Sequence, residues 1–412
     1  MPPLNRSQFA DLRGAGLMIV DALAGISRIV EDMHTTIQRR PLPLGAQRTR
    51  PARGITGFVY RSVHGGIRLA GAGADALLAP LSRLAPPGTR SPAHEAMVAA
   101  VNGVHGDYLA RTGNPLAIDM ALRLRGQPID AADPAAGLAA AGSPGATPRL
   151  VVLVHGLCMS DLQWRRDGHD HGEALARDLG CSVLYLHYNS GRHIHENGRQ
   201  LAALLDTLVA NWPVALDELA ILGHSMGGLV ARSACLHAEQ AGQAWLAKLR
   251  KLISLGTPHL GAPLERGGSV LDLLLDLSPY SAPLARAGKQ RSAGIRDLRH
   301  GTVWATPLAQ ATLPHGVECF AAATTLAERA QALGDALVGD GLVPVASALG
   351  RHRDPAKALP IPKSHQWIGH GIGHLELLNR PAVYAQLRAW LGEGAPVAAR
   401  PRRMRASPTI QP

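Results

Sequence analysis

The chain has 412 residues, of which 46% are hydrophobic and 18% charged, and this length suffices for one large core or for one core with a smaller appendage. The formal net charge of +11 would suit nucleic acid or an anionic membrane surface. However, the arginines are scattered and are not interleaved with aromatic residues, which make up only 4% of the chain. We therefore expect no nucleic-acid partner, whereas peripheral membrane contact stays open.

The cysteines and the N-terminus bear on the compartment. Four cysteines lie singly and form no Cys-x-x-Cys pair, so we expect buried free thiols, as in a reducing compartment: Cys158, Cys181, Cys235 and Cys319. The stretch 15–33, AGLMIVDALAGISRIVEDM, is interrupted by Asp21 and Arg28 and does not resemble a secretory signal. No window has the roughly 18 uncharged apolar residues of a membrane span. A cytoplasmic location is expected, either free or peripheral at a membrane.

Residues 1–106 predict an N-terminal helical region. Apolar residues that step by four and three along 8–38 and again along 63–84 predict two helices, each with a narrow apolar seam. The first seam consists of Leu12, Gly16, Ile19, Leu23, Ile26, Val30, Met33 and Ile37, and the second of Val63, Ile67, Ala70, Ala74, Leu77, Leu81 and Leu84. Three prolines interrupt residues 39–54, so we expect an antiparallel hairpin docked on the rest of the chain or on a second copy. A seam that faces lipid is the alternative. AHEAMVAAVNGVHG, residues 93–106, predicts a third helix.

Residues 107–148 are expected to connect the N-terminal helices to the region that follows. Residues 107–126 alternate around Gly113-Asn114, which predicts a β-hairpin. Residues 129–148 are rich in Ala, Pro and Gly and are expected to form a low-complexity loop.

From residue 149 onward, short apolar runs alternate with helical patterns. The runs are RLVVLVHG (149–156), SVLYLHY (182–188), ELAILGHS (218–225), KLISLGTP (251–258) and VECFAAAT (317–324). Helices are expected around 172–179, 196–211, 226–241 and 265–299, and a last one opens at Pro381. This alternation predicts an α/β fold with a mostly parallel central sheet covered on both faces. We assign this domain to residues 107–394 and expect the basic tail 395–412 to be disordered.

A serine occupies the bend between the run at 218–225 and the helix that follows it. Gly223-His224-Ser225-Met226-Gly227 is a G-x-S-x-G in a strand-turn-helix context, where the bend forces the serine into a strained conformation and exposes its hydroxyl. The alternative is a helix N-cap serine. Because a serine hydroxyl is a weak nucleophile, Ser225 requires a base, an orienting acid and donors for an oxyanion. The amides of Leu157, after His155-Gly156, and of Met226 are the expected oxyanion donors.

The acid and the base are expected later in the chain, in the order Ser, Asp, His. Asp340 lies in a Gly-flanked turn after the run at 317–324, and His374 directly precedes the last helix. Asp335 and Asp354 are competing acids, although Asp335 is better placed in a helix at 326–337. His365 and His370 are competing bases, and the other interpretation of His374 is a structural histidine.

Five motifs, VHGL, GHSMGG, LGTPHLGAP, GDGLVP and GHLELLN, resemble the α/β-hydrolase fold of the lipase/esterase class. Within this class the resemblance is to bacterial triacylglycerol lipases and to lipase-like hydrolases related to GPI inositol-deacylase, and it covers roughly residues 107–392. In that family the Asp of a D-G-L-V turn and the His of an H-L-x-x-x-N stretch complete the triad, which corresponds to Asp340 and His374. Extracellular members carry signal peptides, and some have a disulfide or calcium. Neither a signal nor a cysteine pair is indicated here.

The resemblance implies a serine hydrolase for esters with an apolar acyl part, with no metal or organic cofactor. An acyltransferase or thioesterase that uses the same triad is one alternative, and a non-catalytic protein that binds a membrane surface or a partner is another. A cap is expected at about 261–315, where Leu271, Leu274, Leu275 and Leu277 would line an acyl cleft or only pack the core. The histidines of GHDHGE (168–173) and GRHIHENG (191–198) lack closed metal-ligand sets, so no metal is expected.

Overall fold

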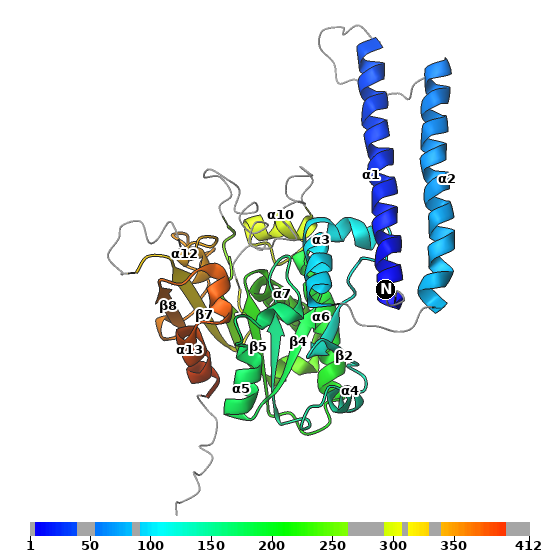
Figure 1. Ribbon diagram of the computed structural model, residues 1–412. Helices are drawn as coiled ribbons and strands as arrows, with labels where there is room; N and C mark the ends of the chain where they lie inside the picture. Colours follow the sequence, from blue (N-terminus) through cyan, green and yellow to red (C-terminus); the bar gives the residue numbers. More distant parts are fainter. Residues whose placement is uncertain are drawn as a thin grey trace, which may run out of the picture.

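The computed structural model describes residues 5–38, 54–84, 91–262, 292–306, 312–328 and 339–392 (Figure 1). Most of the predicted cap at 261–315, including its four leucines, lies outside the described residues, and so do the tail from 395 and Asp335.

Eight strands form a single sheet in the order β2-β1-β4-β3-β5-β6-β7-β8. The strands from β3 to β8 are parallel to their neighbours, whereas β1 is antiparallel to β2 and β4. Their bounds are β1 (Ala121–Leu124), β2 (Gln127–Ile129), β3 (Arg149–Val154), β4 (Ser182–His187), β5 (Glu218–His224), β6 (Leu249–Leu255), β7 (Glu318–Thr325) and β8 (Gln366–His370). The five predicted runs are β3 to β7, so the predicted α/β fold with a mostly parallel sheet is confirmed.

Helices cover both faces of this sheet because successive strand residues point to opposite sides. Leu150 and Val152 of β3 belong to the core under α6 (Ile194–Ala210) and α7 (Met226–Ala241), while Val151 and Leu153 belong to the core under α5 (His171–Leu179) and α13 (Pro381–Gly392). The remaining α-helices in the described part of the domain are α3 (Pro92–Arg111), α4 (Pro134–Ala140), α10 (Ala293–His300) and α12 (Val345–Ala348). Short 3-10 turns are η1 (Asp161–Trp164), η2 (Ala244–Lys248), η3 (Lys363–His365) and η4 (His374–Leu378).

Two connections differ from the sequence-based prediction. The β-hairpin turns at Arg125-Gly126, because Gly113 instead adopts the left-handed conformation that ends α3, with a φ of 62°. The stretch 129–148, expected to be a loop, contains α4, whose N-terminus is capped by Asp133.

The third predicted helix is longer than expected. It continues to Arg111, so α3 crosses the boundary that the sequence suggested between residues 106 and 107. Asn102 on α3 donates to the carbonyl of Leu116 at 2.7 Å and accepts from the amide of Ile118 at 3.0 Å. Helix α3 therefore packs as part of the α/β body.

The first two helices, α1 (Arg6–Gln38) and α2 (Gly54–Leu84), run antiparallel and side by side and project from the body (Figure 1). Arg13 pairs with Asp75 at 2.5 Å, and Gly71 lies against Val20. The N-terminal half of α1 contacts the body, where Asn114 donates to the carbonyl of Gly14 at 3.0 Å.

The large apolar side chains of the α1 seam that the structure describes are not buried between the two helices. Leu12, Ile19 and Leu23 of α1 are 50%, 60% and 48% exposed. The described contacts between the helices include Gly71, a small residue that allows close approach to Val20, and the Arg13–Asp75 ion pair. Of the helices that the structure describes, none combines the length and the apolar character needed to cross a membrane.

Candidate active site

The candidate site lies where the strand order reverses. The chain passes from β3 to β4 on one side and then to β5 on the other side of β3. At such a switch point the loops after the two strands diverge and leave a crevice at the carboxyl edge of the sheet. The loop after β3 carries Leu157, and the turn after β5 carries Ser225.

Ser225 is held in a strained conformation at this edge. Its φ of 54° and ψ of −124° lie in a region that side chains rarely adopt, and its amide donates to the carbonyl of Leu255 at 2.8 Å. Close approach makes the bend possible, since a Cβ at Gly223 would lie 2.5 Å from Gly228 and one at Gly227 would lie 2.1 Å from the carbonyl oxygen of Val154. The glycines of the motif are therefore required by packing as well as by the turn.

His374 and Asp340 form a buried pair. Nδ1 of His374 lies 2.7 Å from Oδ2 of Asp340, and the two side chains are 3% and 1% exposed. The other carboxylate oxygen, Oδ1, accepts from the amides of Leu342 at 3.0 Å and Val343 at 2.8 Å. In addition, the amide of His374 donates to the carbonyl of Asp340 at 3.1 Å. These bonds fix the imidazole so that Nε2 points away from the carboxylate, and Nε2 has no hydrogen-bond partner within the described residues.

Ser225 and His374 line the same small cavity, of about 130 Å³. Its other lining residues are Gly156, Leu157, Cys158, Met159, Gln163, Arg165, Arg166, His224, Leu375 and Leu378. Neither the amide of Leu157 nor that of Met226 forms a hydrogen bond with any described residue. The structure thus brings together the serine, the histidine with its acid, and a loop with a free amide.

Helix α3 packs against the loop that follows β3. Cys158 has a left-handed φ of 59°, and its amide donates to Oγ of Ser190 at 3.1 Å. A Cβ at Gly103 would lie 2.2 Å from the sulfur of Cys158, so α3 supports the loop by direct contact. The sequence did not indicate this contact, because a glycine within a helical pattern carries no sign of its partner.

A buried charge cluster anchors the far end of the same loop. Arg123 of β1 lies 3.2 Å from Asp161 and 3.6 Å from Glu95, and Nδ1 of His187 lies 3.1 Å from Asp161. Its members come from α3, β1, β4 and η1 and are far apart in the sequence, so sequence reasoning missed it.

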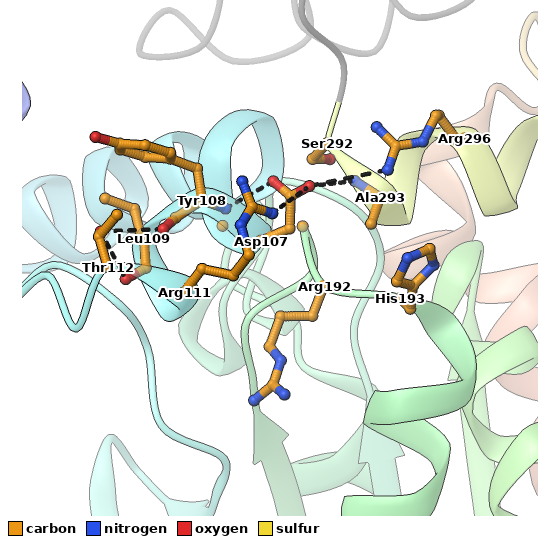
Figure 2. A network of polar contacts seen from close by, with 12 residues as sticks. Asp107, Tyr108, Leu109, Arg111, Thr112, Arg192, His193, Ser292, Ala293 and Arg296 are labelled. Atoms are coloured by element: carbon orange, nitrogen blue, oxygen red, sulfur yellow. Dashed lines mark hydrogen bonds and ion pairs between the residues drawn. The ribbon is translucent and has the colours of Figure 1, made fainter. Parts of the chain in front are cut away.

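A second contact joins α3 to α10 (Figure 2). Asp107 accepts from the amide of Ala293 at 3.1 Å and pairs with Arg111 at 3.6 Å and with Arg296 at 4.0 Å, as Figure 2 shows. Ser292 donates to the carbonyl of Gly103 at 2.7 Å. Helix α3 is therefore fixed both to the loop after β3 and to α10.

Two further histidines next to the cavity have structural contacts. Burial lowers the pKa of His155 to about 3, and its ring stacks on Tyr188 with centroids 4.3 Å apart. Burial, together with the nearby His374, holds the pKa of His224 well below its usual value, and Nε2 of His224 lies 3.2 Å from the carbonyl of His374. Both rings are neutral at pH 7 and shape the loops around Ser225.

The competing candidates lie elsewhere. Nδ1 of His365 lies 3.2 Å from the carbonyl of Cys319, and His370 is exposed at the end of β8. Asp354 is exposed and bonds within its own turn. None of the three lines the Ser225 cavity.

The histidine-rich stretches form contacts that the sequence did not specify. Nε2 of His171 lies 2.9 Å from the carbonyl of Leu377, which belongs to η4, the turn that begins at His374. In the other stretch, ligand atoms of His193, His195 and Asp297 lie within 4.8 Å of one another. Asp297 already accepts from the amide of Ile194 at 2.9 Å and from His193 at 3.0 Å, so its carboxylate caps α6. The four cysteines are free and buried, as predicted.

The chain was compared with known proteins. No curated protein matches it. Among solved structures it is similar to the mature lipase BlEst2 of Bacillus licheniformis, with 19% identity over 60% of this chain and 93% of that one and a TM-score of 0.39. It is also similar to the RedJ thioesterase of Streptomyces coelicolor (18% identity, 60% and 91% covered, TM-score 0.34) and to lipase B of Aspergillus fumigatus (16%, 57% and 51%, TM-score 0.35).

A family model matches part of the chain. Residues 146–299 match the family described as a PGAP1-like alpha/beta domain, and the match includes Leu157, Ser225 and Met226 but ends before Asp340 and His374. This match agrees with the motif resemblance and with the sheet topology. Over residues 146–299, the chain is thus similar to the PGAP1-like alpha/beta domain family.

Proposed function

We propose that this protein is a carboxylic ester hydrolase that acts through Ser225, His374 and Asp340. The observation that carries the proposal is the shared cavity, in which a serine at a strained bend lies with a histidine whose Nδ1 is bound to a buried carboxylate at 2.7 Å. This is the arrangement of nucleophile, base and orienting acid that acyl transfer by a serine requires.

In the first step, Nε2 of His374 removes the proton of Ser225 as Oγ attacks the ester carbonyl. The tetrahedral intermediate places a negative charge on the former carbonyl oxygen. The free amides of Leu157 and Met226 would donate to this oxygen, an interaction that strengthens as the charge develops. Asp340 keeps the proton of His374 on Nδ1 and stabilises the imidazolium that forms.

In the second step, His374 gives its proton to the leaving alcohol, and the acyl group remains on Ser225. Water then attacks the acyl enzyme while His374 again acts as base, and the acid product leaves. Leu157, Met159, Leu375 and Leu378 give the cavity an apolar wall, which supports a substrate with an apolar acyl part, including a lipid-like one.

The alternatives differ from ester hydrolysis in the substrate or in the molecule that accepts the acyl group. A thioesterase would use the same steps on a thioester, and an acyltransferase would replace the water by another acceptor. Products from p-nitrophenyl esters of increasing acyl length, from matched thioesters and from mixtures with an added alcohol would separate the three activities.

The test of the proposal is labelling by a fluorophosphonate, which reacts with activated serines. Wild-type protein should be labelled at Ser225, and Ser225→Ala should lose both the label and ester hydrolysis, with kcat reduced by about 10⁴-fold or more. Ser143→Ala, at a half-buried serine outside the cavity, is the matched control and should behave as wild type. Labelling or turnover that persists in folded Ser225→Ala would overturn the assignment, and an unlabelled wild type would favour the non-catalytic alternative.

A further inference from the structure

A second and larger cavity, of about 860 Å³, lies on the same molecule and shares no lining residue with the Ser225 cavity. Its walls come from the loop after β6, from the segment that leaves α10, from the loop after α12 and from one side chain of α7. The lining residues are Arg232, His259, Leu260, His300, Gly301, Thr302, Val303, Trp304, Ala305, Thr306, His352, Asp354, Ala356 and Lys357.

Arg232 of α7 is a buried cation in this wall. The residue is only 4% exposed, and its Nε donates to the carbonyl of Thr312 at 3.0 Å. Its Nη1 is buried and has no hydrogen-bond partner, and no carboxylate pairs with the guanidinium, within the described residues. Burial lowers the pKa of Arg232 to about 10, so the side chain still carries its charge at neutral pH. A buried cation without a counter-charge is unfavourable, and an anion in the cavity would offset this cost.

His259 lies next to Arg232 and also has buried nitrogen atoms without a hydrogen-bond partner among the described residues. It is 5% exposed, and both of its ring nitrogens are buried with no partner among the described residues. Burial, and after it the charge of Arg232, holds the pKa of His259 well below its usual value, so the ring is neutral and offers one N–H donor. The main chain at this residue is fixed, because the amide of His259 donates to the carbonyls of Thr257 at 2.8 Å and Ser347 at 3.2 Å.

The rim of the cavity is also basic. His300, His352 and Lys357 lie along it, against one carboxylate, that of Asp354. One oxygen of that carboxylate already accepts from the amide of Ala356 at 3.0 Å. Trp304 provides an aromatic wall, with its ring 4.3 Å from that of His237.

We propose that this cavity binds an oxyanion of the phosphate type between Arg232 and His259. The planar fork of an arginine donates to two oxygens of such an anion, and a neutral histidine donates to a third. The cavity is much larger than a phosphate ion, so a phosphate ester with an organic group beside Trp304 also fits. Two sources share this chemistry, namely inorganic phosphate and the phosphate of a lipid headgroup.

The experiment measures binding of inorganic phosphate by titration calorimetry and by the rise in Tm, against chloride at matched ionic strength. It uses the full chain and also Ser225→Ala, so that the result does not depend on the proposed ester hydrolysis. Wild type and Ser225→Ala should both bind phosphate. Arg232→Gln should lose about tenfold or more in affinity, and Lys357→Ala, at the exposed rim, about two- to threefold. Arg177→Gln, which removes one charge from an exposed site on α5, should bind as wild type.

The site is located independently by fluorescence. A phosphate-induced change in tryptophan emission should be present in wild type and absent from Trp304→Phe, which should still bind phosphate by calorimetry. If Arg232→Gln does not fold, the His259→Phe/Lys357→Ala double variant takes its place and should lose at least as much affinity. Wild type without a phosphate-specific effect, or unchanged affinity in the cavity variants, would overturn the proposal.

Two further measurements distinguish inorganic phosphate from the phosphate of a lipid headgroup as the ligand. If the anion belongs to a headgroup, Arg232→Gln should weaken binding to phosphatidylglycerol-containing vesicles and leave binding of neutral soluble esters unchanged. If the anion is free phosphate, Arg232→Gln should not alter vesicle binding, and inorganic phosphate should remain the tighter ligand.

Discussion

At the scale of single residues, His374 is the side chain on which the proposed chemistry depends most directly. His374→Ala should lower kcat for a soluble ester by about 10⁴-fold or more, similar to the serine substitution, because the two residues act as one unit. Both Tm and circular dichroism should show that the variant is folded.

His365 and His370 supply matched controls, since the sequence alone offers them as bases and the structure places neither in the Ser225 cavity. Their alanine variants should retain wild-type kcat. Loss of activity in His370→Ala together with an active His374→Ala would reassign the base.

The buried histidines also predict a pH dependence of stability. Burial lowers the pKa of His155 to about 3 and of His171 to about 4, and it holds those of His224 and His259 well below the usual 6.5. These rings stay neutral in the native state, whereas in the unfolded chain they take up protons below pH 6.5. Their contribution to the free energy of unfolding is therefore complete above pH 6.5 and is lost as the pH falls from 6.5 toward the native values of about 4 and 3.

Each of these histidines should lower the free energy of unfolding by about 1.4 kcal/mol per pH unit once the pH is well below 6.5. Denaturant melts at a series of pH values between about 7.5 and 5 measure this slope, in a range above the titration of most carboxyl groups. In His171→Gln the dependence of the free energy of unfolding on pH should be weaker by about 1.4 kcal/mol per pH unit, which corresponds to one proton. An unchanged dependence would show that His171 is not buried as a neutral ring.

Sequence reasoning proposed Ser225, Asp340 and His374 because each lies in a short motif with neighbouring glycines. It did not find Arg232 or His259 as candidate ligands. Arg232 follows the serine motif on an ordinary helix, and His259 lies in a motif that the family resemblance already explained. What distinguishes them is that Nη1 of Arg232 and both ring nitrogens of His259 are buried without a hydrogen-bond partner among the described residues, which a linear pattern does not contain.

At the scale of elements, the contact between α3 and the loop after β3 links the N-terminal part of the chain to the candidate site. Gly103→Ala would place a Cβ 2.2 Å from the sulfur of Cys158 and 2.9 Å from its backbone. Either the loop or the helix must move, and Leu157, the proposed oxyanion donor, directly precedes Cys158. We expect a loss of about 1–3 kcal/mol in stability from overpacking and a loss of about tenfold or more in kcat.

Gly66→Ala is the control for this substitution, because a Cβ at Gly66 on α2 meets nothing within 4 Å. There kcat should remain at the wild-type value, and Tm should be unchanged or slightly higher because Ala favours a helix over Gly. If Gly103→Ala shows the Tm and kcat of wild type, α3 does not set the position of the loop.

The strands and helices differed in how far the sequence specified them. The buried strands β3 to β7 were predicted because each is a continuous apolar run with clear ends. Strand β8, QWIGH, is half-buried and short and has no such pattern, so it was missed. The hairpin was placed too early, because Gly113-Asn114 suits a helix end as well as a hairpin turn, and only the pairing of Leu124 with Gln127 distinguishes the two.

At the scale of the whole molecule, the projecting pair α1 and α2 carries an apolar face that the body does not cover. Leu12, Ile19 and Leu23 lie on one side of α1, because their spacing of seven and four returns to the same face of a helix. Periodicity identifies an apolar face and not its partner. The contact of Gly71 with Val20 and the Arg13–Asp75 pair, which lie between the two helices, have no counterpart in the periodic pattern.

We propose that this face lies on an anionic lipid surface. Residues 1–95 contain twelve arginines, no lysine and six acidic residues, an excess of positive charge that favours anionic headgroups next to the exposed leucines. The full chain should sediment with phosphatidylglycerol-containing vesicles at low salt and less so at high salt. The Leu12→Ser/Ile19→Ser/Leu23→Ser variant should lose this binding, whereas Met97→Ser, at an exposed apolar residue on the body, should keep it.

Deletion of residues 1–84 extends this test and leaves Ser91, the N-cap of α3, in place. The truncated protein should lose vesicle binding and become less soluble, because Leu116 and Ile118 form a small core that Met18 of α1 covers. Hydrolysis of a small soluble ester should persist, since no residue of α1 or α2 lines the Ser225 cavity. A triple variant that binds vesicles as wild type does would contradict the membrane proposal. If light scattering instead shows that the triple variant converts a dimer into a monomer, then a second copy of the chain, and not lipid, covers this face.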